Sequence, residues 1–341
     1  MRSFRGTGWG IALALLAGCG TEDEPVVASS LISPPSILVD LDPTSTAMTF
    51  TVENLTVSSQ AQLFFSDRES GNVLRLDPAS PTPAIVGTIE DRTDRASSMQ
   101  LKGNAGGLVF TPSGDLLLAS ATFNEVLRLS AGALDATSPV AAQTFITGTQ
   151  GANAIVVDGD YVYVTGGVTG NIYRASLAFG GEAQVWATIA ANTRAVPPDN
   201  HSTQAVVSNG IARDDTGFMV ADTSRGAIWH IPLDPDGSAG TPQMLVQNSK
   251  LEGADGISFD PQGRLWAAVN ERNALVVVEA GQVHEAYKNG NSGPLEFPAA
   301  LVFIDDVGYV ANYDRPRRDN LAPDGKTSNA GIGSSIARFQ L

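Results

Sequence analysis

Two residues with oxygen-bearing side chains, Asn209 and Asp255, occupy the same place in two stretches of similar sequence. Each is followed by glycine near the start of its stretch, which runs from Ser208 to Leu233 in one case and from Gly253 to Val278 in the other. Amide and carboxylate oxygens are ligands for hard cations such as calcium. Asn-Gly and Asp-Gly are also common turn dipeptides, so residue type alone leaves a cation site and a simple turn both open.

The two stretches belong to a longer series of repeats. Each holds a short apolar strand, a turn at a glycine, a second apolar strand and, after a polar turn, a third, which is about one blade of a β-propeller. Six such units follow one another, and their strand-start positions, about fifty residues apart, are Glu53, Ala105, Asn153, Asn209, Asp255 and Ala299. Alanine stands at two of these positions. The polar residues at the others are therefore not a turn requirement of every repeat.

The pattern predicts an all-β fold, a six-bladed β-propeller with four antiparallel strands per blade, as a single domain over residues 36–341. Period-two alternation is clear in strands such as 161–164, and no 3.6-residue apolar pattern is sustained after the first residues. A ring of blades is stable only when its first and last strands leave no open edge. We expect the ring to close by pairing of an N-terminal strand, Ser36 to Leu41, with the C-terminal strand, Ser335 to Leu341.

Residues 1–18 have the features of a signal peptide, since two arginines precede an apolar run that is too short to span a membrane. The run ends in the letters LAGC, which resemble the bacterial lipobox, and Cys19 is the only cysteine of the chain. We expect a lipoprotein anchored in the bacterial cell envelope through Cys19; an ordinary secretory signal is the alternative. Gly20 favours the outer membrane, and residues 19–35, acidic and then rich in Ser and Pro, are predicted to be a flexible tether.

The chain is strongly acidic, with a formal net charge of −15, and removal of the signal peptide takes away two arginines and no acidic residue. A surface of this sign repels nucleic acid and anionic lipid headgroups. We therefore expect no nucleic-acid partner, and membrane contact through the Cys19 lipid alone. The sequence also lacks a phosphate-binding loop, a GxSxG nucleophile elbow, and HxxxH or CxxC metal spacings.

Six repeats with Asn-Gly and Asp-Gly at strand-start positions resemble the senescence marker protein/gluconolactonase family, whose relatives include diisopropyl fluorophosphatase and the paraoxonases. The resemblance covers about residues 53–341 and is strongest in 253–260 and 208–212. It implies a divalent cation, usually calcium, at one mouth of the central tunnel, with the ligands Glu53, Asn153, Asn209 and Asp255. Glu53 departs from the family pattern, because the family's Glu-Gly pair is here Glu53-Asn54.

The resemblance further implies a hydrolase of lactones or related esters or phosphoesters, acting on a small molecule, in which the cation polarises the reacting oxygen and positions a water. Asp255 is a candidate for both ligand and general base. His201 is a second catalytic candidate, because it lies in a long insertion, 190–207, that we expect at the same mouth; an exposed loop histidine is the alternative. Further insertions cover 90–105 and 313–333. The alternative function is a non-catalytic propeller that binds a glycan or protein through its loop face, with any metal structural.

Overall fold

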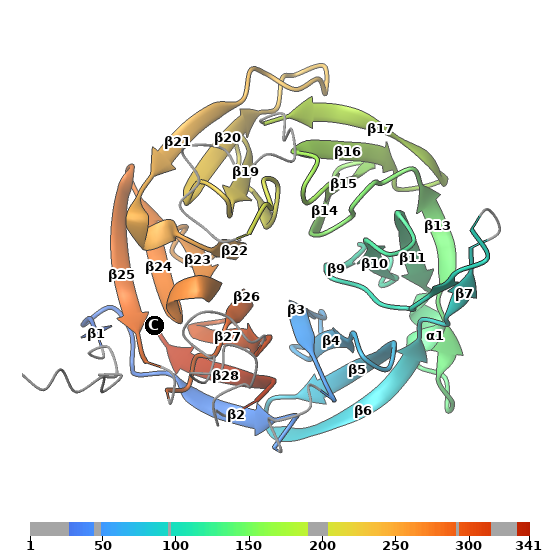
Figure 1. The fold of residues 1–341 in the computed structure, drawn as a ribbon, viewed down its shortest axis with the longest axis horizontal. Helices are drawn as coiled ribbons and strands as arrows, with labels where there is room; N and C mark the ends of the chain where they lie inside the picture. Colours follow the sequence, from blue (N-terminus) through green and yellow to red (C-terminus); the bar gives the residue numbers. More distant parts are fainter. Residues whose placement is uncertain (1–26, 44–48, 95–96, 190–203, 291–292, 315–332) are drawn as a thin grey trace, which may run out of the picture.

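The computed structural model describes residues 27–43, 49–94, 97–189, 204–290, 293–314 and 333–341. Within these ranges the strands form a closed ring of blades around one axis, as Figure 1 shows. The ring contains six blades of four antiparallel strands, which confirms the predicted β-propeller. Helical structure in the described residues is limited to α1 (Ala131–Leu134) and to the 3-10 turns η1 (Ser249–Leu251) and η2 (Asn270–Arg272).

The first three blades run from the axis outward in chain order. Blade one contains β3 (Val52–Val57), β4 (Leu63–Asp67), β5 (Asn72–Asp77) and β6 (Ser80–Thr88). Blade two contains β9 (Leu108–Phe110), β10 (Leu116–Ser120), β11 (Glu125–Leu129) and β13 (Gln143–Thr147), and between the last two a short strand, β12 (Val140–Ala141), pairs with β6. Blade three contains β14 (Ile155–Asp158), β15 (Tyr161–Thr165), β16 (Asn171–Ser176) and β17 (Gly180–Thr188).

The remaining blades follow the same plan. Blade four contains β18 (Ile211–Arg213), β19 (Gly217–Asp222), β20 (Ala227–Pro232) and β21 (Gln243–Gln247). Blade five contains β22 (Ala254–Phe259), β23 (Leu265–Val269), β24 (Ala274–Glu279) and β25 (Gln282–Lys288). Blade six contains β26 (Pro298–Ile304), β27 (Val307–Asn312), β28 (Ser335–Gln340) and, as its outer strand, β2 (Ser36–Asp40). The small hairpin of β7 (Arg92–Thr93) and β8 (Gln100–Leu101) forms part of the 90–105 insertion.

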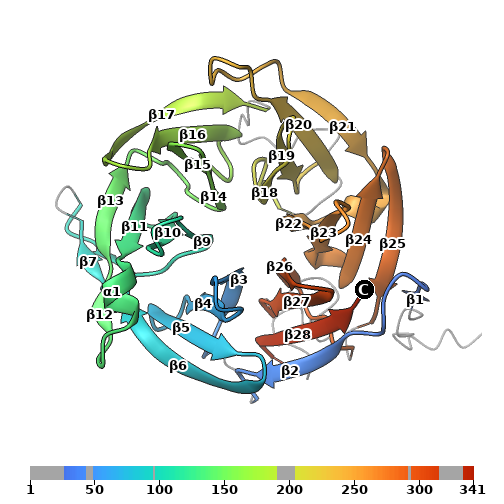
Figure 2. The same ribbon diagram turned by 180° about the vertical axis from the view of Figure 1, so that it is seen from behind.

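The ring closes as predicted, because β2 pairs antiparallel with β28 and Ile37 lies opposite Ala337. Figure 2 shows β2 running along the outer side of β28, so that residues from both ends of the described chain complete one blade. Residues 27–35, predicted to belong to the tether, also pack on the ring: β1 (Val27–Ala28) extends blade five at β25, and Ile32 is buried in the core. The part of the chain that packs on the propeller therefore begins before residue 36, because the free edge of β25 offers backbone hydrogen-bonding groups.

The hydrophobic core lies between the blades. One cluster of buried apolar side chains fills each of the six junctions between neighbouring blades. The second strands are covered on both faces, which explains why Leu116, Leu117 and Leu118 follow one another without alternation, all fully buried. Packing on both sides fixes each inner strand relative to its neighbours, so residues about fifty positions apart meet at the axis.

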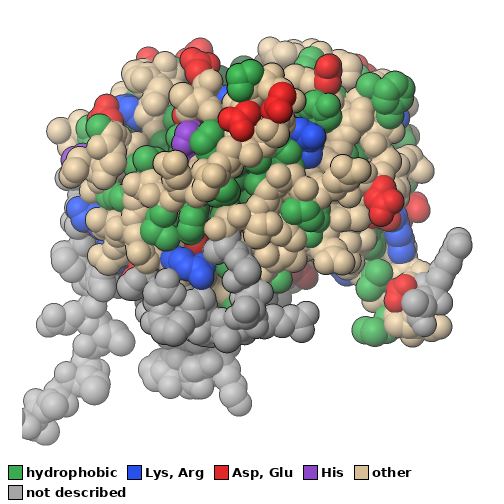
Figure 3. All heavy atoms as spheres, turned by 90° about the horizontal axis from the view of Figure 1, so that it is seen from above, with side chains coloured by type: hydrophobic (Ala, Val, Ile, Leu, Met, Phe, Trp, Pro, Cys, Tyr) green, Lys and Arg blue, Asp and Glu red, His purple; other side chains and the backbone are tan. Residues whose placement is uncertain are grey.

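The edge-on view of the ring shows hydrophobic side chains scattered among acidic, basic and other polar ones (Figure 3). Among the described residues, no helix combines the length and the apolar character needed to cross a membrane. The predicted signal peptide, Cys19, the tether as far as residue 26, and His201 lie outside the described residues.

Candidate functional site

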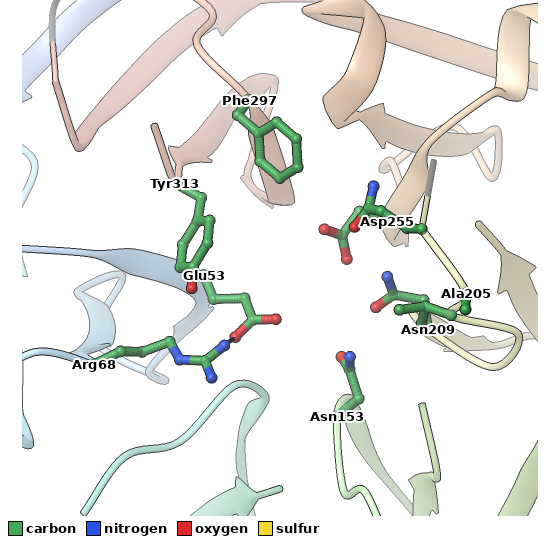
Figure 4. A pocket seen from close by; sticks show the side chains of 10 residues that line it. Glu53, Arg68, Asn153, Ala205, Asn209, Asp255, Phe297 and Tyr313 are labelled. Atoms are coloured by element: carbon green, nitrogen blue, oxygen red, sulfur yellow. Dashed lines mark hydrogen bonds and ion pairs between the residues drawn. The ribbon is translucent and has the colours of Figure 1, made fainter. Parts of the chain in front are cut away.

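A cavity of about 340 Å³ opens at the end of the axis where the inner strands begin. Its walls come from five of the six blades and from the end of the 190–207 insertion; the lining residues are Glu53, Arg68, Asn153, Gln204, Ala205, Val206, Asn209, Asp255, Phe297 and Tyr313. All four predicted ligands are therefore in one cavity. Figure 4 shows the side chains of Glu53, Asn153, Asn209 and Asp255 pointing toward one another across it.

The propeller geometry brings these four residues together. Glu53 is the second residue of β3 and Asp255 the second residue of β22, whereas Asn153 and Asn209 stand two residues before β14 and β18. Each thus lies at the mouth end of an inner strand, where successive blades present equivalent positions to the axis. Blades two and six have alanine there and add no oxygen to this ring.

The structure decides against the turn-dipeptide interpretation of Asn209-Gly210 and Asp255-Gly256. Neither glycine has a positive φ. A Cβ atom on Gly210 would lie 2.3 Å from the carbonyl oxygen of Asp255, and one on Gly256 would lie 2.7 Å from that of Ala299. The Gly210 N–H donates to the Asp255 carbonyl at 3.1 Å. Glycine is required because adjacent inner strands approach closely, not because the chain turns.

A hydrogen-bond chain fixes the orientation of the Asn209 amide. Its Nδ2 donates to Thr223 Oγ1 at 2.9 Å, and Thr223 Oγ1 donates to the carbonyl oxygen of Ala254 at 2.6 Å. Because the nitrogen is engaged on the side of Thr223, Oδ1 faces the cavity (Figure 4). Asn209 is only 3% exposed, so this orientation is held by a buried network.

A second chain orients the carboxylate of Asp255. Asn270, the first residue of η2, donates from Nδ2 to Asp255 Oδ2 at 2.9 Å. Gln204 donates from Nε2 to Asn270 Oδ1 at 2.8 Å, which fixes the amide of Asn270 in turn. The 190–207 insertion therefore reaches the cavity through its last residues, as predicted, and supports the ligand that blade five supplies.

Glu53 is bound by a residue that the sequence did not single out. Arg68, directly after β4, forms an ion pair with Glu53 through Nη1 and Oε2. The Arg68 guanidinium also lies 5.7 Å from the ring centre of Tyr313. Arg68, Asn270 and Tyr313 all stand where a second strand ends. Antiparallel order places those ends beside the starts of the inner strands, so strand direction could have identified them.

The donor set fits a hard divalent cation. Two carboxylates offset its charge and two amide oxygens add neutral ligands, as in oxygen-rich calcium sites. Nowhere in the described part of the chain do three His, Cys, Asp or Glu side chains form a metal-binding group, so two of the four donors here have to be amides. Among the described residues that line the cavity there is no His or Cys, so these donors match calcium better than zinc.

The fold and the cavity define a six-bladed β-propeller with an oxygen-donor site at one mouth. The family model described as "SMP-30/Gluconolactonase/LRE-like region" matches residues 53–303, which is more than half of the chain. The chain belongs to this family, as the sequence resemblance predicted. No curated protein matches it at the level of sequence.

Solved structures share the fold at low identity. A luciferin-regenerating enzyme has a TM-score of 0.62 and 12% identity, with 90% of this chain and 95% of that chain covered. The gluconolactonase from Xanthomonas campestris has a TM-score of 0.59 and 14% identity, covering 94% and 98%. An aldose sugar dehydrogenase from Streptomyces coelicolor, bound to PQQ, has a TM-score of 0.57 and 16% identity, covering 92% and 99%. Because these chemistries differ, the likeness establishes architecture, and function must be argued from the site.

Proposed function

We propose that the protein is a divalent-cation-dependent hydrolase of lactones or of related esters or phosphoesters. The observation that carries this proposal is the convergence of Glu53, Asn153, Asn209 and Asp255 on one cavity. Membership in the SMP-30/gluconolactonase family supports the hydrolase class. Calcium is the proposed cation because the donors are all oxygens.

The four cavity residues would hold the cation, which would supply polarisation of the carbonyl or phosphoryl oxygen of the substrate. Asp255 would accept the proton of the attacking water, with its carboxylate oriented by Asn270. In lactone hydrolysis the water oxygen bonds to the carbonyl carbon, the ring C–O bond breaks, and the ring oxygen receives a proton. His201 stays a proposed second proton acceptor.

Metal analysis of the purified protein, followed by lactone hydrolysis with and without chelator, tests the proposal. We expect about one divalent cation per chain, loss of hydrolysis on chelation, and recovery when calcium is returned. Absence of bound cation, with activity and melting temperature unchanged by chelator, would contradict it. Bound calcium without hydrolysis of any lactone or ester would instead support the non-catalytic alternative, in which the cation is structural.

We also propose that the protein is a lipoprotein of the bacterial cell envelope, anchored through Cys19 in the outer membrane. Support comes from the sequence around Cys19, since this part of the chain lies outside the described residues. The anchored protein should partition into detergent, whereas a Cys19→Ser variant should not. Equal partitioning of both would contradict the anchor.

A further inference from the structure

Arg68 is the basic side chain among the described residues that line the cavity. Backbone hydrogen bonds fix the position of Arg68. Its backbone N–H donates to the Thr51 carbonyl at 3.0 Å, and Asp67 Oδ1 accepts from the backbone N–H groups of Thr51 and Glu69. Figure 4 shows the guanidinium beside the Glu53 carboxylate, on the side away from Asp255 and Asn209. A rigid turn therefore holds a permanent positive charge next to the proposed cation site.

Among the described residues that line the cavity, the charges do not balance once a divalent cation is added. Glu53 and Asp255 together carry two negative charges, and the two asparagines carry none. A divalent cation would neutralise both carboxylates, and Arg68 would then leave one positive charge in excess. The Glu53 carboxylate cannot bind the guanidinium and the cation equally tightly at the same time, since the two positive charges repel each other at close range. Cation binding should therefore release Arg68 from Glu53.

We propose that Arg68 binds an anionic group of the substrate, a carboxylate that is separate from the reacting ester, and that Glu53 holds Arg68 until the cation binds. This inference rests on the proposed function, because it requires the cation site. A guanidinium presents paired N–H donors that match the two oxygens of a carboxylate. Cation and anion then assist each other's binding, and by linkage each raises the affinity of the other by the same factor.

The wall around Arg68 indicates what accompanies the anionic group. Phe297 and Tyr313 line the cavity there, with ring centres 6.2 Å apart. Phe297 has a φ of 47°, a backbone conformation that is rare for a bulky residue and is held by a hydrogen bond from its N–H to Asn273 Oδ1 at 2.8 Å. Two neighbouring aromatic rings, of which Tyr313 lies beside the guanidinium, suit a flat apolar body bearing a carboxylate. The substrate class is thus a carboxylated lactone or ester with a flat apolar part.

Benzoate and its neutral isostere benzamide are suitable probes, and calorimetric titration of the whole protein measures their binding. With calcium present, the wild-type protein should bind benzoate about 10- to 100-fold more tightly than benzamide, the range expected for a hydrogen-bonded charge pair. Without calcium, this preference should largely disappear. Arg68→Gln should lose the preference under both conditions and should bind calcium about 10-fold more tightly, because the competing charge is gone.

Arg75→Gln, a variant of another arginine of the same blade, should behave as wild type. Arg68→Lys should keep part of the benzoate preference, since it keeps the charge but not the paired donors. The role of Arg68 would be overturned if the wild type bound calcium but showed the same preference for benzoate as Arg68→Gln. The same conclusion would follow if neither protein preferred benzoate. Either result would leave the cation site standing. Failure of the wild type to bind calcium would instead overturn the proposed function, and this inference with it.

Discussion

The two ends of the inner strands hold their polar side chains by different means. At the mouth, the neutral side chains of Thr223 and Asn270 hydrogen-bond to Asn209 and Asp255, and Arg68 is ion-paired with Glu53. At the opposite end of β22, Asp260 accepts hydrogen bonds from Arg264 Nε at 2.6 Å and from Trp266 Nε1 at 2.7 Å. Two carboxylates near the ends of one strand therefore have different surroundings.

The difference bears on which carboxylates stabilise the fold and which could bind a ligand. Asp260 is matched by an arginine a few residues away, and it is not among the residues that line the cavity. Asp158 at the far end of β14 is also matched by an arginine, since its carboxylate lies 3.2 Å from Arg213 Nε. A carboxylate aimed into a cavity by an amide is oriented without being neutralised by that amide. Asp255 lines the cavity whereas Asp260 and Asp158 do not, which supports structural roles at the far end and the proposed cation site at the mouth.

The largest expected effect is on calcium affinity, and it should appear when an aspartate is removed at the mouth but not when one is removed at the far end. Asp255→Ala removes one of the two carboxylates of the proposed site and should weaken calcium binding by at least about 100-fold, because affinity depends strongly on ligand charge. Asp260→Ala removes a carboxylate from the same blade and should leave calcium affinity unchanged while lowering stability. Calorimetric titration and urea unfolding measure the two quantities. Equal loss of calcium binding in both variants would contradict the assignment.

An intermediate effect is expected from the residue that orients Asp255. Asn270→Ala should weaken calcium binding by about 10-fold, the low end of the range for residues that position metal ligands. Gln204→Ala, one step further along the same hydrogen-bond chain, should have a smaller effect. Asn248→Ala is the control, because Asn248 caps η1 in the connection between blades four and five and is not among the cavity residues. A calcium affinity of Asn270→Ala equal to that of wild type would show that orientation of Asp255 does not matter.

The smallest effect concerns the pH dependence of stability. At the mouth side, burial of Asp314 and the nearby charges of Asp42 and Asp40 raise the pKa of Asp314 to about 6, despite a hydrogen bond with Glu296. The folded protein then binds the proton more tightly than the unfolded chain, so stability falls as pH rises from about 4 to about 6. Asp314→Asn should remove this loss and stabilise the protein at pH 7 by about 1 to 2 kcal/mol, with little change at pH 4. Urea unfolding at the two pH values measures it.

Asp260→Asn should show the opposite sign. Burial opposes ionisation of Asp260, but hydrogen bonds from Trp266 and Arg264 hold its pKa below the usual range. Its stabilising contribution is therefore present above pH 4 and is lost as pH falls through the lowered pKa. The destabilisation by Asp260→Asn should shrink on acidification. If both variants showed the same pH profile, the contrast between the two ends would not hold.

The sequence predicted the parts of this protein that repeat. Strand-start positions could be aligned because each blade has the same strand order, and the pairing of β2 with β28 followed from the need to close the ring. The location of Glu53, Asn153, Asn209 and Asp255 in one cavity agrees with the placement that the family resemblance implied.

Several contacts between distant parts of the chain could not be predicted from the sequence. The glycine after Asp255 looked like a turn residue, although its lack of a side chain is required by the neighbouring strand at Ala299. Within blade one, the pairing of Arg68 with Glu53 was not predicted, although antiparallel order places the end of β4 beside the start of β3. The packing of residues 27–35 on blade five depends on an open strand edge that only the folded ring presents.

A crystal structure of the protein grown with calcium tests the central claim most directly. We predict one calcium ion in the mouth cavity, within about 2.3 to 2.6 Å of side-chain oxygens of Glu53, Asn153, Asn209 and Asp255, with Arg68 turned away from Glu53. An empty cavity at saturating calcium, or an ion bound elsewhere on the propeller, would contradict it.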